Sequence, residues 1–379
     1  IQELNGRPLY KTDKGQLHYF DLGGDYKELK RPEGIILLSD IKRAADHKPV
    51  DKNGSASLWD IGDGALCIEF HTKMNAMDQD IFAMYHKAIG LIGDGKGDYK
   101  ALVVHNEGKN FSAGANLGMA LFMLNIGLFD QIEGFVSGGQ EAYKAIKYAP
   151  FPVVAAPSGM CLGGGCEILL HVDHVAAHAE SYIGLVEVGV GLLPAWGGSK
   201  EMILRHTNAN RRKLGPSGGG PMSAISKVFE IISMAKTSKS AHEAFDYKYL
   251  LKSRDTVVMN RDRLLYNAKK RALELAKDYS PPKPEAEENS VNLPGVSGRL
   301  ALEQFVENFH KSGKATDYDV VVSNAVAYVL TGGETDLKDE INEEMLLKLE
   351  KEQFMKLVKQ HGTLERIEHM LETGKPLRN

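Results

Sequence analysis

GMCLGGGCE (159–167) is the stretch of this 379-residue chain that decides its fold and its chemistry. Three successive glycines let the backbone approach a ligand closely, because no Cβ stands in the way. A helix that begins here aims unpaired N–H groups and the positive end of its dipole outward. Such a site suits an oxyanion that forms during a reaction, and Glu167 falls in the first turn beside it. The alternative is a plain glycine turn in which Glu167 only favours the helix N-terminus.

Two further segments carry groups that could complete such a site. FSAGAN (111–116) is a glycine turn leading from a strand to a helix, and it can supply the second N–H donor of an oxyanion hole. GLVEVGVGLLPAWGG (184–198) places Glu187 in an apolar run, where an unpaired carboxylate is costly. A buried glutamate has a raised pKa and can exchange protons near neutral pH. The alternative is that Glu187 faces solvent on an edge.

The surrounding segments alternate between strand and helix patterns. Apolar strands are expected at 65–70, 101–105, 152–156 and 174–177, and helices at 77–92, 117–127, 140–149 and 161–171. This alternation predicts an α/β layer structure. Beyond residue 205 the pattern weakens. Helices are expected there at 240–251, 259–279, 336–360 and 363–374, and 280–298 has the composition of a linker.

Taken together and in this order, the three motifs resemble the crotonase (enoyl-CoA hydratase/isomerase) superfamily. The family pattern is an AGAD turn, a GGGCE helix start, a second glutamate, and a P-x-x-GG turn, and the similarity covers roughly residues 60–205. The resemblance implies a ClpP/crotonase-like spiral of repeated ββα units with a helical C-terminal extension. It also implies that Ala115 and Gly164 give the oxyanion-hole N–H groups, and that Glu167 and Glu187 are the two catalytic glutamates.

The same resemblance implies residues that contact the substrate. Lys73 lies in a loop similar to the one that follows the coenzyme A moiety, which makes it a candidate phosphate contact. The remaining implied substrate-binding residues are Ala113, Gly114, Asn116, Gly163, Pro194 and Trp196. Two of these depart from the family pattern. Asn116 replaces the aspartate of AGAD, which keeps a turn-type hydrogen bond but drops a charge. Trp196 stands at a place that is often glycine-rich, and we expect its bulk to narrow or shift the acyl pocket.

The expected domain organisation follows from the extent of the resemblance. Residues 1–60 are a lead-in segment, 61–205 the crotonase core, 206–335 a long insertion with helices and a linker, and 336–379 the C-terminal helices that complete the domain. The insertion, the start at Ile1 and the ending GKPLRN resemble the hydratase half of a bifunctional 3-hydroxyacyl-CoA dehydrogenase/enoyl-CoA hydratase. On that reading the chain is a fragment preceded by an N-terminal dehydrogenase domain. The charged segment 336–360 is expected to dock on the core through its apolar residues.

Composition narrows the cofactors and partners. A net charge of −4 gives no basic field for nucleic acid, and no apolar run is long enough for a membrane span. Cys67, Cys161 and Cys166 form no CxxC pair, which fits a reducing cytoplasm. His171, His174 and His178 cross a helix-to-strand junction without an acidic–His motif, so no metal is expected. No GxGxxG follows a strand, so NAD is expected only in a dehydrogenase half, and coenzyme A enters as part of the substrate. The resemblance also allows a homo-oligomer.

Three functions remain open at this point. The favoured one is hydration of 2-enoyl-CoA to 3-hydroxyacyl-CoA in fatty-acid β-oxidation, by a water held between two carboxyl groups. The second is a Δ3-Δ2-enoyl-CoA isomerase, which works mainly with one glutamate. The third is a non-catalytic crotonase scaffold for a dehydrogenase. The presence of both glutamates favours the hydratase.

Overall fold

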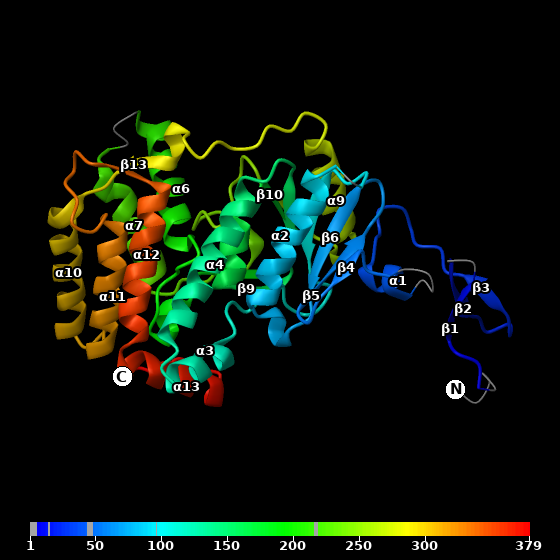
Figure 1. Cartoon of the computed structure of the whole chain (residues 1–379), viewed down its shortest axis with the longest axis horizontal. Helices are drawn as coiled ribbons and strands as arrows, with labels where there is room; N and C mark the ends of the chain where they lie inside the picture. The colour runs from blue at the N-terminus through cyan, green and yellow to red at the C-terminus, as the bar shows by residue number, and fades with distance from the viewer. Residues whose placement is uncertain (1–5, 14–15, 44–47, 96, 216–218) are drawn as a thin grey trace.

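The computed structural model describes residues 6–13, 16–43, 48–95, 97–215 and 219–379, and a seven-stranded sheet forms its centre (Figure 1). The strand order is β12-β10-β8-β7-β6-β5-β4. Strands β12 to β6 run parallel, whereas β5 pairs antiparallel with β6, and β4 antiparallel with β5. The bounds are β4 Asp51–Lys52, β5 Ala56–Asp60, β6 Ala65–Phe70, β7 Ala101–His105, β8 Val153–Ala156, β10 His174–His178 and β12 Thr256–Val258.

Both faces of this sheet are buried, as parallel sheets require. Side chains alternate between two apolar clusters: Leu102 and Val104 of β7 point to one face, and Ala101 and Val103 to the other. Helix α2 (Gln79–Gly93) contacts β5 and β6 and packs against α4 (Phe129–Lys147), while α9 (Leu264–Leu275) packs against β7, β8 and β10. The segments that are apolar throughout in the sequence therefore form the central strands, and helices cover both of their faces.

A second, two-stranded parallel sheet supplies the repeat unit of the fold. Its strands are β9 (Gly159–Leu162) and β11 (Ser181–Gly184). The order β8, β9, α5 (Gly164–His171) is one ββα unit, and the order β10, β11, η3 (Glu187–Val190), α6 (Gly198–Leu214) is the next. The expected α/β architecture of repeated ββα units is confirmed, and both candidate glutamates stand just after the second strand of a unit.

The C-terminal part is helical, as expected, and α11 packs against α7, α10 and α12 (Figure 1). Its elements are α7 Pro221–Ser233, α8 Ala241–Ala244, η4 Arg261–Arg263, η5 Glu287–Asn289, β13 Ser290–Asn292, α10 Gly295–Lys311, α11 Asp317–Leu330, β14 Glu340–Asn342, α12 Glu343–Val358 and α13 His361–Thr373. The charged helix docks on the core, since Leu346, Leu347 and Leu357 of α12 are buried. Leu337 is an apolar residue of the segment 336–360 that was expected to dock, but it precedes the helix and is exposed.

Three local predictions in this region are wrong. The segment expected as a linker at 280–298 contains β13, which pairs with β14, and the first turn of α10. The helix expected at 240–251 is only the four-residue α8, because Lys248 has a positive φ and turns follow. The helix expected from residue 336 begins at Glu343, after β14. In each case a tertiary pairing or a turn overrides the local composition.

The domain boundaries expected from the sequence also need correction. Strands β4 and β5 belong to the central sheet, which therefore begins ahead of residue 61. The segment 206–335 is not a separate insertion throughout, because β12 extends the same sheet and α9 covers one of its faces. The described residues before residue 50 include a three-stranded antiparallel sheet and α1 (Leu38–Arg43), which lie at one end of the molecule (Figure 1). The small sheet consists of β1 Tyr10–Asp13, β2 Gln16–Phe20 and β3 Tyr26–Glu28.

Among the described residues, no helix combines the length and the apolar character needed to cross a membrane.

Candidate active site

Two backbone N–H groups, those of Ala115 and Gly164, lie near each other where two glycine turns meet. Gly114 has a φ of 91°, and a Cβ on it would lie 3.1 Å from Leu162 O and 3.5 Å from Gly164 N. Gly164 is the first residue of α5, so its N–H has no acceptor inside the helix. Across the residues that the structure describes, neither this N–H nor that of Ala115 donates a hydrogen bond. The two implied oxyanion donors are therefore close together and unpaired.

The turn that carries Ala115 is held by the loop before α2. Ala113 N donates to Met74 O at 3.1 Å, and Met77 N donates to Gly114 O at 2.8 Å. Asn116 caps α3 (Leu117–Asn125), its Oδ1 accepting from Met119 N at 3.1 Å. The turn-type hydrogen bond expected of Asn116 is thus present. These contacts fix the direction of the Ala115 N–H without using it.

Lys73 lies in the same loop, in η2 (Lys73–Asn75), where its side chain is exposed. Its ammonium group makes no hydrogen bond or ion pair within the described ranges. The position beside the 113–116 turn is compatible with a phosphate contact, and that role stays a prediction.

Gly163 and Gly164 are glycines for different reasons. Gly163 has a φ of 54° and donates its N–H to Gly184 O at 2.9 Å, which joins β9 to β11 at the site. At Gly164 a Cβ would overlap the six-membered ring of Trp196. The Gly164 carbonyl accepts from Tyr143 Oη at 2.8 Å. The donor residue is therefore packed from one side and hydrogen-bonded through its carbonyl, while its N–H stays free.

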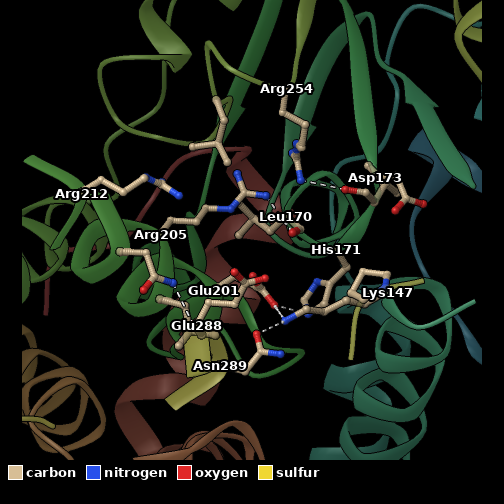
Figure 2. A pocket seen from close by; sticks show the side chains of 15 residues that line it. Lys147, Leu170, His171, Asp173, Glu201, Arg205, Arg212, Arg254, Glu288 and Asn289 are labelled. Atoms are coloured by element: carbon tan, nitrogen blue, oxygen red, sulfur yellow. Dashed lines mark hydrogen bonds and ion pairs between the residues drawn. The ribbon is translucent and has the colours of Figure 1, made fainter. Parts of the chain in front are cut away.

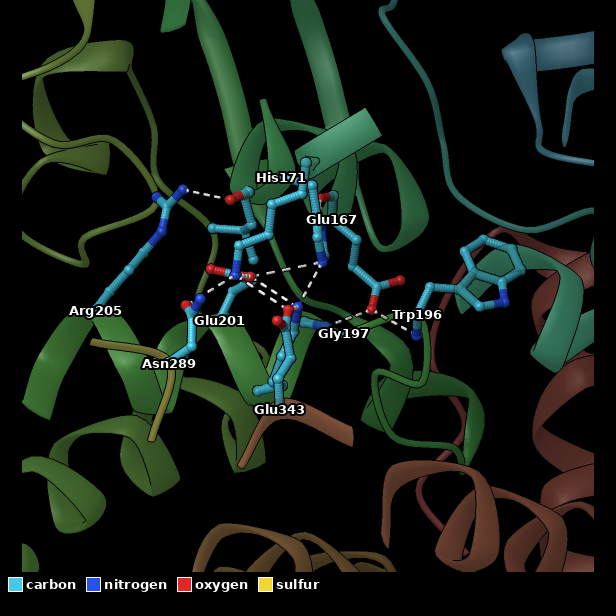
Figure 3. Close-up of polar contacts among 12 residues, drawn as sticks. Glu167, His171, Trp196, Gly197, Glu201, Arg205, Asn289 and Glu343 are labelled. Carbon is cyan, nitrogen blue, oxygen red and sulfur yellow. Dashed lines mark hydrogen bonds and ion pairs between the residues drawn. The ribbon is translucent and has the colours of Figure 1, made fainter. Parts of the chain in front are cut away.

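Glu167 is almost completely buried, with 1% of its surface exposed, and points at the turn before α6. Its Oε1 accepts from Trp196 N at 2.9 Å and from Gly198 N at 2.8 Å (Figure 3). Burial raises the pKa of Glu167 to about 7, although the N–H groups of Gly198 and Trp196 act in the opposite direction. This carboxyl group therefore changes its charge near neutral pH.

Glu187 stands at the start of η3, and its Oε1 would lie 3.1 Å from a Cβ on Gly163. Its Oε2 is buried and has no hydrogen-bond partner among the described residues, so Glu187 does not simply face solvent on an edge. Burial, and then the charge of Glu167, raise the pKa of Glu187 well above its ordinary value. The charges of the two carboxyl groups therefore influence each other's pKa. The arrangement favours a state in which Glu187 is protonated and Glu167 is ionised.

Trp196 and Pro194 form the wall behind Glu167. The indole packs edge-on against Phe82 and Phe135, with ring centroids 5.2 and 5.3 Å apart, and against Tyr143 at 5.8 Å. Pro194 is buried, and its carbonyl accepts from Ser199 Oγ. The ring of Trp196 thus fills the space beside Gly164, and the expectation that it narrows or shifts the acyl pocket stays a prediction.

Comparisons with known proteins show which proteins this chain is similar to. Residues 60–211 match the family model of enoyl-CoA hydratase/isomerase. The chain is 40% identical over 372 residues to a Bacillus subtilis protein named "Probable 3-hydroxyacyl-CoA dehydrogenase", covering 98% of this chain and 45% of the relative. It is 31% identical over 137 residues to the crotonyl-CoA hydratase of Syntrophomonas wolfei, covering 36% of this chain and 51% of that enzyme. The solved enoyl-CoA hydratase of Bacillus halodurans shares the fold, with a TM-score of 0.53 at 16% identity over 83% of this chain and 99% of that structure.

This chain belongs to the crotonase superfamily. It spans about half the length of these curated relatives.

The sequence did not point to the residues that hold the 194–198 turn of this crotonase. Gln140 of α4 donates through Nε2 to Ala195 O at 2.8 Å and to Leu347 O of α12 at 2.9 Å. Glu350 of α12 accepts from Gly197 N and Lys200 N. These residues lie far from the motifs along the chain. The one sequence feature that could have indicated such a role is a glutamate on the face of a charged helix that docks on the core.

The opposite end of α5 opens into a cavity of about 300 Å³, whose lining does not include the candidate catalytic residues of this crotonase (Figure 2). Arg205 donates to the carbonyls of Leu170 (2.7 Å) and Leu169, and to those of Lys248 and Tyr249. Arg254 donates to Val172 O at 2.7 Å. Burial, and then the charge of Arg254, lower the pKa of Arg205 to about 10. Here the guanidinium groups are structural caps on the helix C-terminus.

A buried ion cluster lies between this cavity and the active site (Figure 3). Glu201 accepts from Lys147 Nζ and Lys200 Nζ, each at 2.7 Å, and Glu343 of α12 binds the same two lysines. Burial alone would raise the pKa of both glutamates, but the charges of the two lysines outweigh it. The pKa of Glu201 is held well below its ordinary value and that of Glu343 at about 2. The cluster ties α4, α6 and α12 together with fixed charges.

The three histidines considered as metal ligands lie apart from one another in their contacts. His171 Nδ1 binds Glu167 O and its Nε2 binds Lys200 Nζ. His174 Nε2 binds Thr256 Oγ1, and His178 Nδ1 accepts from Glu180 N. In the described parts of the chain, no group of histidine, cysteine and acidic side chains is arranged to hold a metal ion.

Proposed function

We propose that this chain is an enoyl-CoA hydratase, adding water across the 2,3 double bond of an enoyl-CoA thioester in fatty-acid β-oxidation. The observation that carries the proposal is the pairing of two buried, mutually sensing carboxyl groups with two unpaired backbone N–H donors. The family relation and the crotonyl-CoA hydratase among the relatives support it.

The backbone donors stabilise the charge that develops on the thioester. When water adds at C3, negative charge moves to the carbonyl oxygen and forms an enolate. Ala115 N–H and Gly164 N–H would both donate to that oxygen, and the dipole of α5 points its positive end at the same place. Loss of one such donor typically costs about 3–4 kcal/mol of transition-state stabilisation.

The different surroundings of the two carboxyl groups suggest different roles. Glu167 accepts two N–H bonds, which favour its ionised form, so it acts as the base that takes a proton from water. The oxygen of that water forms the bond to C3. Glu187 has an unpartnered oxygen and the higher proton affinity, so it acts as the acid that protonates C2. After the step Glu167 carries a proton and Glu187 is ionised, and proton exchange restores the starting state. The proton that adds to C2 and the hydroxyl group that adds to C3 would reach the same face of the double bond, which makes the addition syn.

The wider context of the site is also a proposal. One relative whose match covers 98% of this chain is named "Probable 3-hydroxyacyl-CoA dehydrogenase" and is about twice as long. The product of hydration is a 3-hydroxyacyl-CoA, which is the substrate class in that name. We propose that this chain corresponds to the hydratase half of such a bifunctional protein, in which NAD binds to the other half and the nucleotide of coenzyme A approaches Lys73.

Hydration of crotonyl-CoA by the purified chain tests the proposal, followed by the loss of enoyl-thioester absorbance. We expect Glu167→Gln and Glu187→Gln each to lower kcat by about 10²–10⁴-fold, as for a lost general base or acid. Glu141→Gln on the exposed side of α4 is the matched control and should retain the wild-type rate.

The same three variants, assayed with a 3-enoyl-CoA, separate hydration from double-bond isomerisation. Loss of hydration in only one of the two site variants would contradict the two-carboxylate mechanism. A wild-type chain that binds acyl-CoA, isomerises nothing and hydrates nothing would instead indicate a scaffold.

A further inference from the structure

We propose that Glu350 of α12 is a positioning residue of the hydration site, acting by holding the 194–198 turn that orients Glu167. The inference rests on the proposed function for its kinetic consequences. Glu350 is 0% exposed and lies 183 positions after Glu167 in the chain (350 against 167), on a helix outside the segment matched by the family model.

The two carboxyl groups hold alternate N–H groups of one short segment. Glu167 Oε1 accepts from Trp196 N and Gly198 N, whereas Glu350 Oε2 accepts from Gly197 N at 2.8 Å and Glu350 Oε1 from Lys200 N at 2.7 Å. Helix α6 begins at Gly198, so these N–H groups have no acceptors within the helix. A movement of the segment that breaks a bond to Glu350 therefore also changes the geometry at Glu167.

The placement of Glu350 is itself fixed by other contacts of α12. Glu343 lies seven residues earlier, on the same face of the helix, and binds Lys147, Lys200 and Tyr148. Between them, Leu347 O accepts from Gln140 Nε2, and the same amide group donates to Ala195 O at the start of the turn. The helix is thus locked in register on the core, and Glu350 reaches the turn as a rigid support.

The titratable groups that interact with Glu167 come from five elements: Tyr143 of α4, Cys166 of α5, Glu187 of η3, Lys200 of α6 and Glu350 of α12. Loss of the turn's N–H bonds would remove an influence that lowers the pKa of Glu167, so its pKa would rise above about 7. Loss of a negative charge at Glu350 would lower the pKa of Glu167. However, burial, and then the charge of Glu167, raise the pKa of Glu350 well above its ordinary value, so the neutral form of Glu350 is favoured and this opposite effect is small. If Glu350 only capped α6, its substitution would neither raise nor lower the pKa of Glu167.

Glu350→Gln is the informative variant, because it keeps the shape but replaces one acceptor oxygen with an NH₂ group facing an N–H. Glu352→Gln is the matched control, since Glu352 lies on the exposed side of α12 in an ion pair with Lys348. The first readout is hydrogen–deuterium exchange of the peptide spanning residues 195–200. We expect faster exchange in Glu350→Gln and no change in Glu352→Gln. This readout needs no activity, so it stands even if the wild-type chain does not hydrate crotonyl-CoA.

The second readout is the kinetics of crotonyl-CoA hydration. We expect kcat of Glu350→Gln to fall by about 10²-fold, as for a small misplacement of a catalytic group, with KM unchanged. We also expect the acid limb of the pH–rate profile to move upward. Should Glu350→Gln fail to fold, Glu350→Asp gives the same readouts, because it shortens the support by one methylene.

Three results would overturn the inference. One is unchanged exchange at 195–200. Another is a loss of unfolding free energy with wild-type kcat and an unmoved acid limb, which would make Glu350 a plain helix cap. The third is a downward move of that limb, which would mean that Glu350 acts through its charge and not through the turn.

Discussion

The two ends of α5 differ in how completely their backbone groups are satisfied. At the N-terminal end, the N–H of Gly164 and the neighbouring N–H of Ala115 donate no hydrogen bond to any residue that the structure describes. At the C-terminal end, Arg205 and Arg254 donate to the carbonyls of Leu169, Leu170 and Val172. We call the N-terminal end of this eight-residue helix the open end, because its N–H groups are available to a ligand. We call the C-terminal end the closed end, because arginine side chains bind its carbonyl groups.

This contrast separates chemistry from structure. Buried polar groups in proteins are nearly always paired, so a cluster of unpaired donors beside an unpartnered carboxyl oxygen indicates a place reserved for a ligand. Carboxyl groups at the open end have raised pKa values and can exchange protons. Guanidinium groups at the closed end use their donors on main-chain carbonyls, which leaves little for a ligand. Substitutions at the open end should therefore affect the rate, and substitutions at the closed end the stability.

Among substitutions that change the backbone groups or their partners at the two ends of α5, the largest effect is expected for Gly164→Ala at the N-terminal end. The new Cβ would overlap the ring of Trp196, so α5 or the indole must move and the donor N–H loses its aim. We expect kcat to fall by about 10²–10³-fold, the usual consequence of losing an oxyanion donor. Gly134→Ala on α4 is the control, because nothing lies within 4 Å of its Cβ position, and it should keep the wild-type rate. A folded Gly164→Ala variant with full activity would contradict the claim that the N-terminal end of α5 serves the reaction.

A second effect concerns stability and pH at the same end. The pKa of Glu167 is about 7 in the folded chain and near 4.5 when unfolded. A raised pKa of this kind contributes stability below pH 4.5 that is lost as the pH rises through about 7, because the unfolded carboxyl group releases its proton first. Between these limits the wild type should lose on the order of 3 kcal/mol of unfolding free energy relative to Glu167→Gln. Urea unfolding at pH 4.5 and pH 8 measures this, and a constant difference between the two proteins would contradict it.

The smallest effect is expected for Arg205→Lys at the closed end. A lysine cannot reach all four carbonyls, and unsatisfied buried acceptors typically cost about 1–3 kcal/mol. Arg212→Lys is the control, since Arg212 lines the same cavity but is exposed and makes no hydrogen bond or ion pair in the described ranges. Chemical denaturation should show the loss only for Arg205→Lys, with kcat unchanged in both. A drop in kcat at full stability would mean that the closed end also takes part in the chemistry.

Much of the fold was predictable because its signals are local. Apolar strands such as ALCIEF and ALVVH, and the glycine turns that start α3 and α5, are read from neighbouring residues, and they lie where expected. The linker-like stretch before α10 was misread, because β13 becomes a strand only by pairing with β14, nearly fifty residues later. The polar composition of a segment alone does not show that it pairs with a distant strand.

The candidate site was predictable only in part: its motif residues were found from the sequence, but the residue that supports the 194–198 turn was not. The motifs located Glu167, Glu187 and the two glycine turns, since each sits on a short segment with a recognisable backbone requirement. Glu350 was not identified, because a glutamate in a charged helix normally faces water, and only the packing of α12 on α6 turns it inward. Its two acceptor bonds depend on contacts about 150 positions apart, which no local pattern encodes.

The most direct measurement is the pH dependence of kcat/KM for crotonyl-CoA hydration by the wild-type chain. The proposed mechanism needs Glu167 ionised and Glu187 protonated. We therefore expect the rate to rise with pH through an apparent pKa near 7 and to fall again at higher pH as the second proton leaves. A rate that is already maximal at pH 5 and stays flat to pH 8 would show that the two carboxyl groups do not share their protons in this way, and would contradict the account.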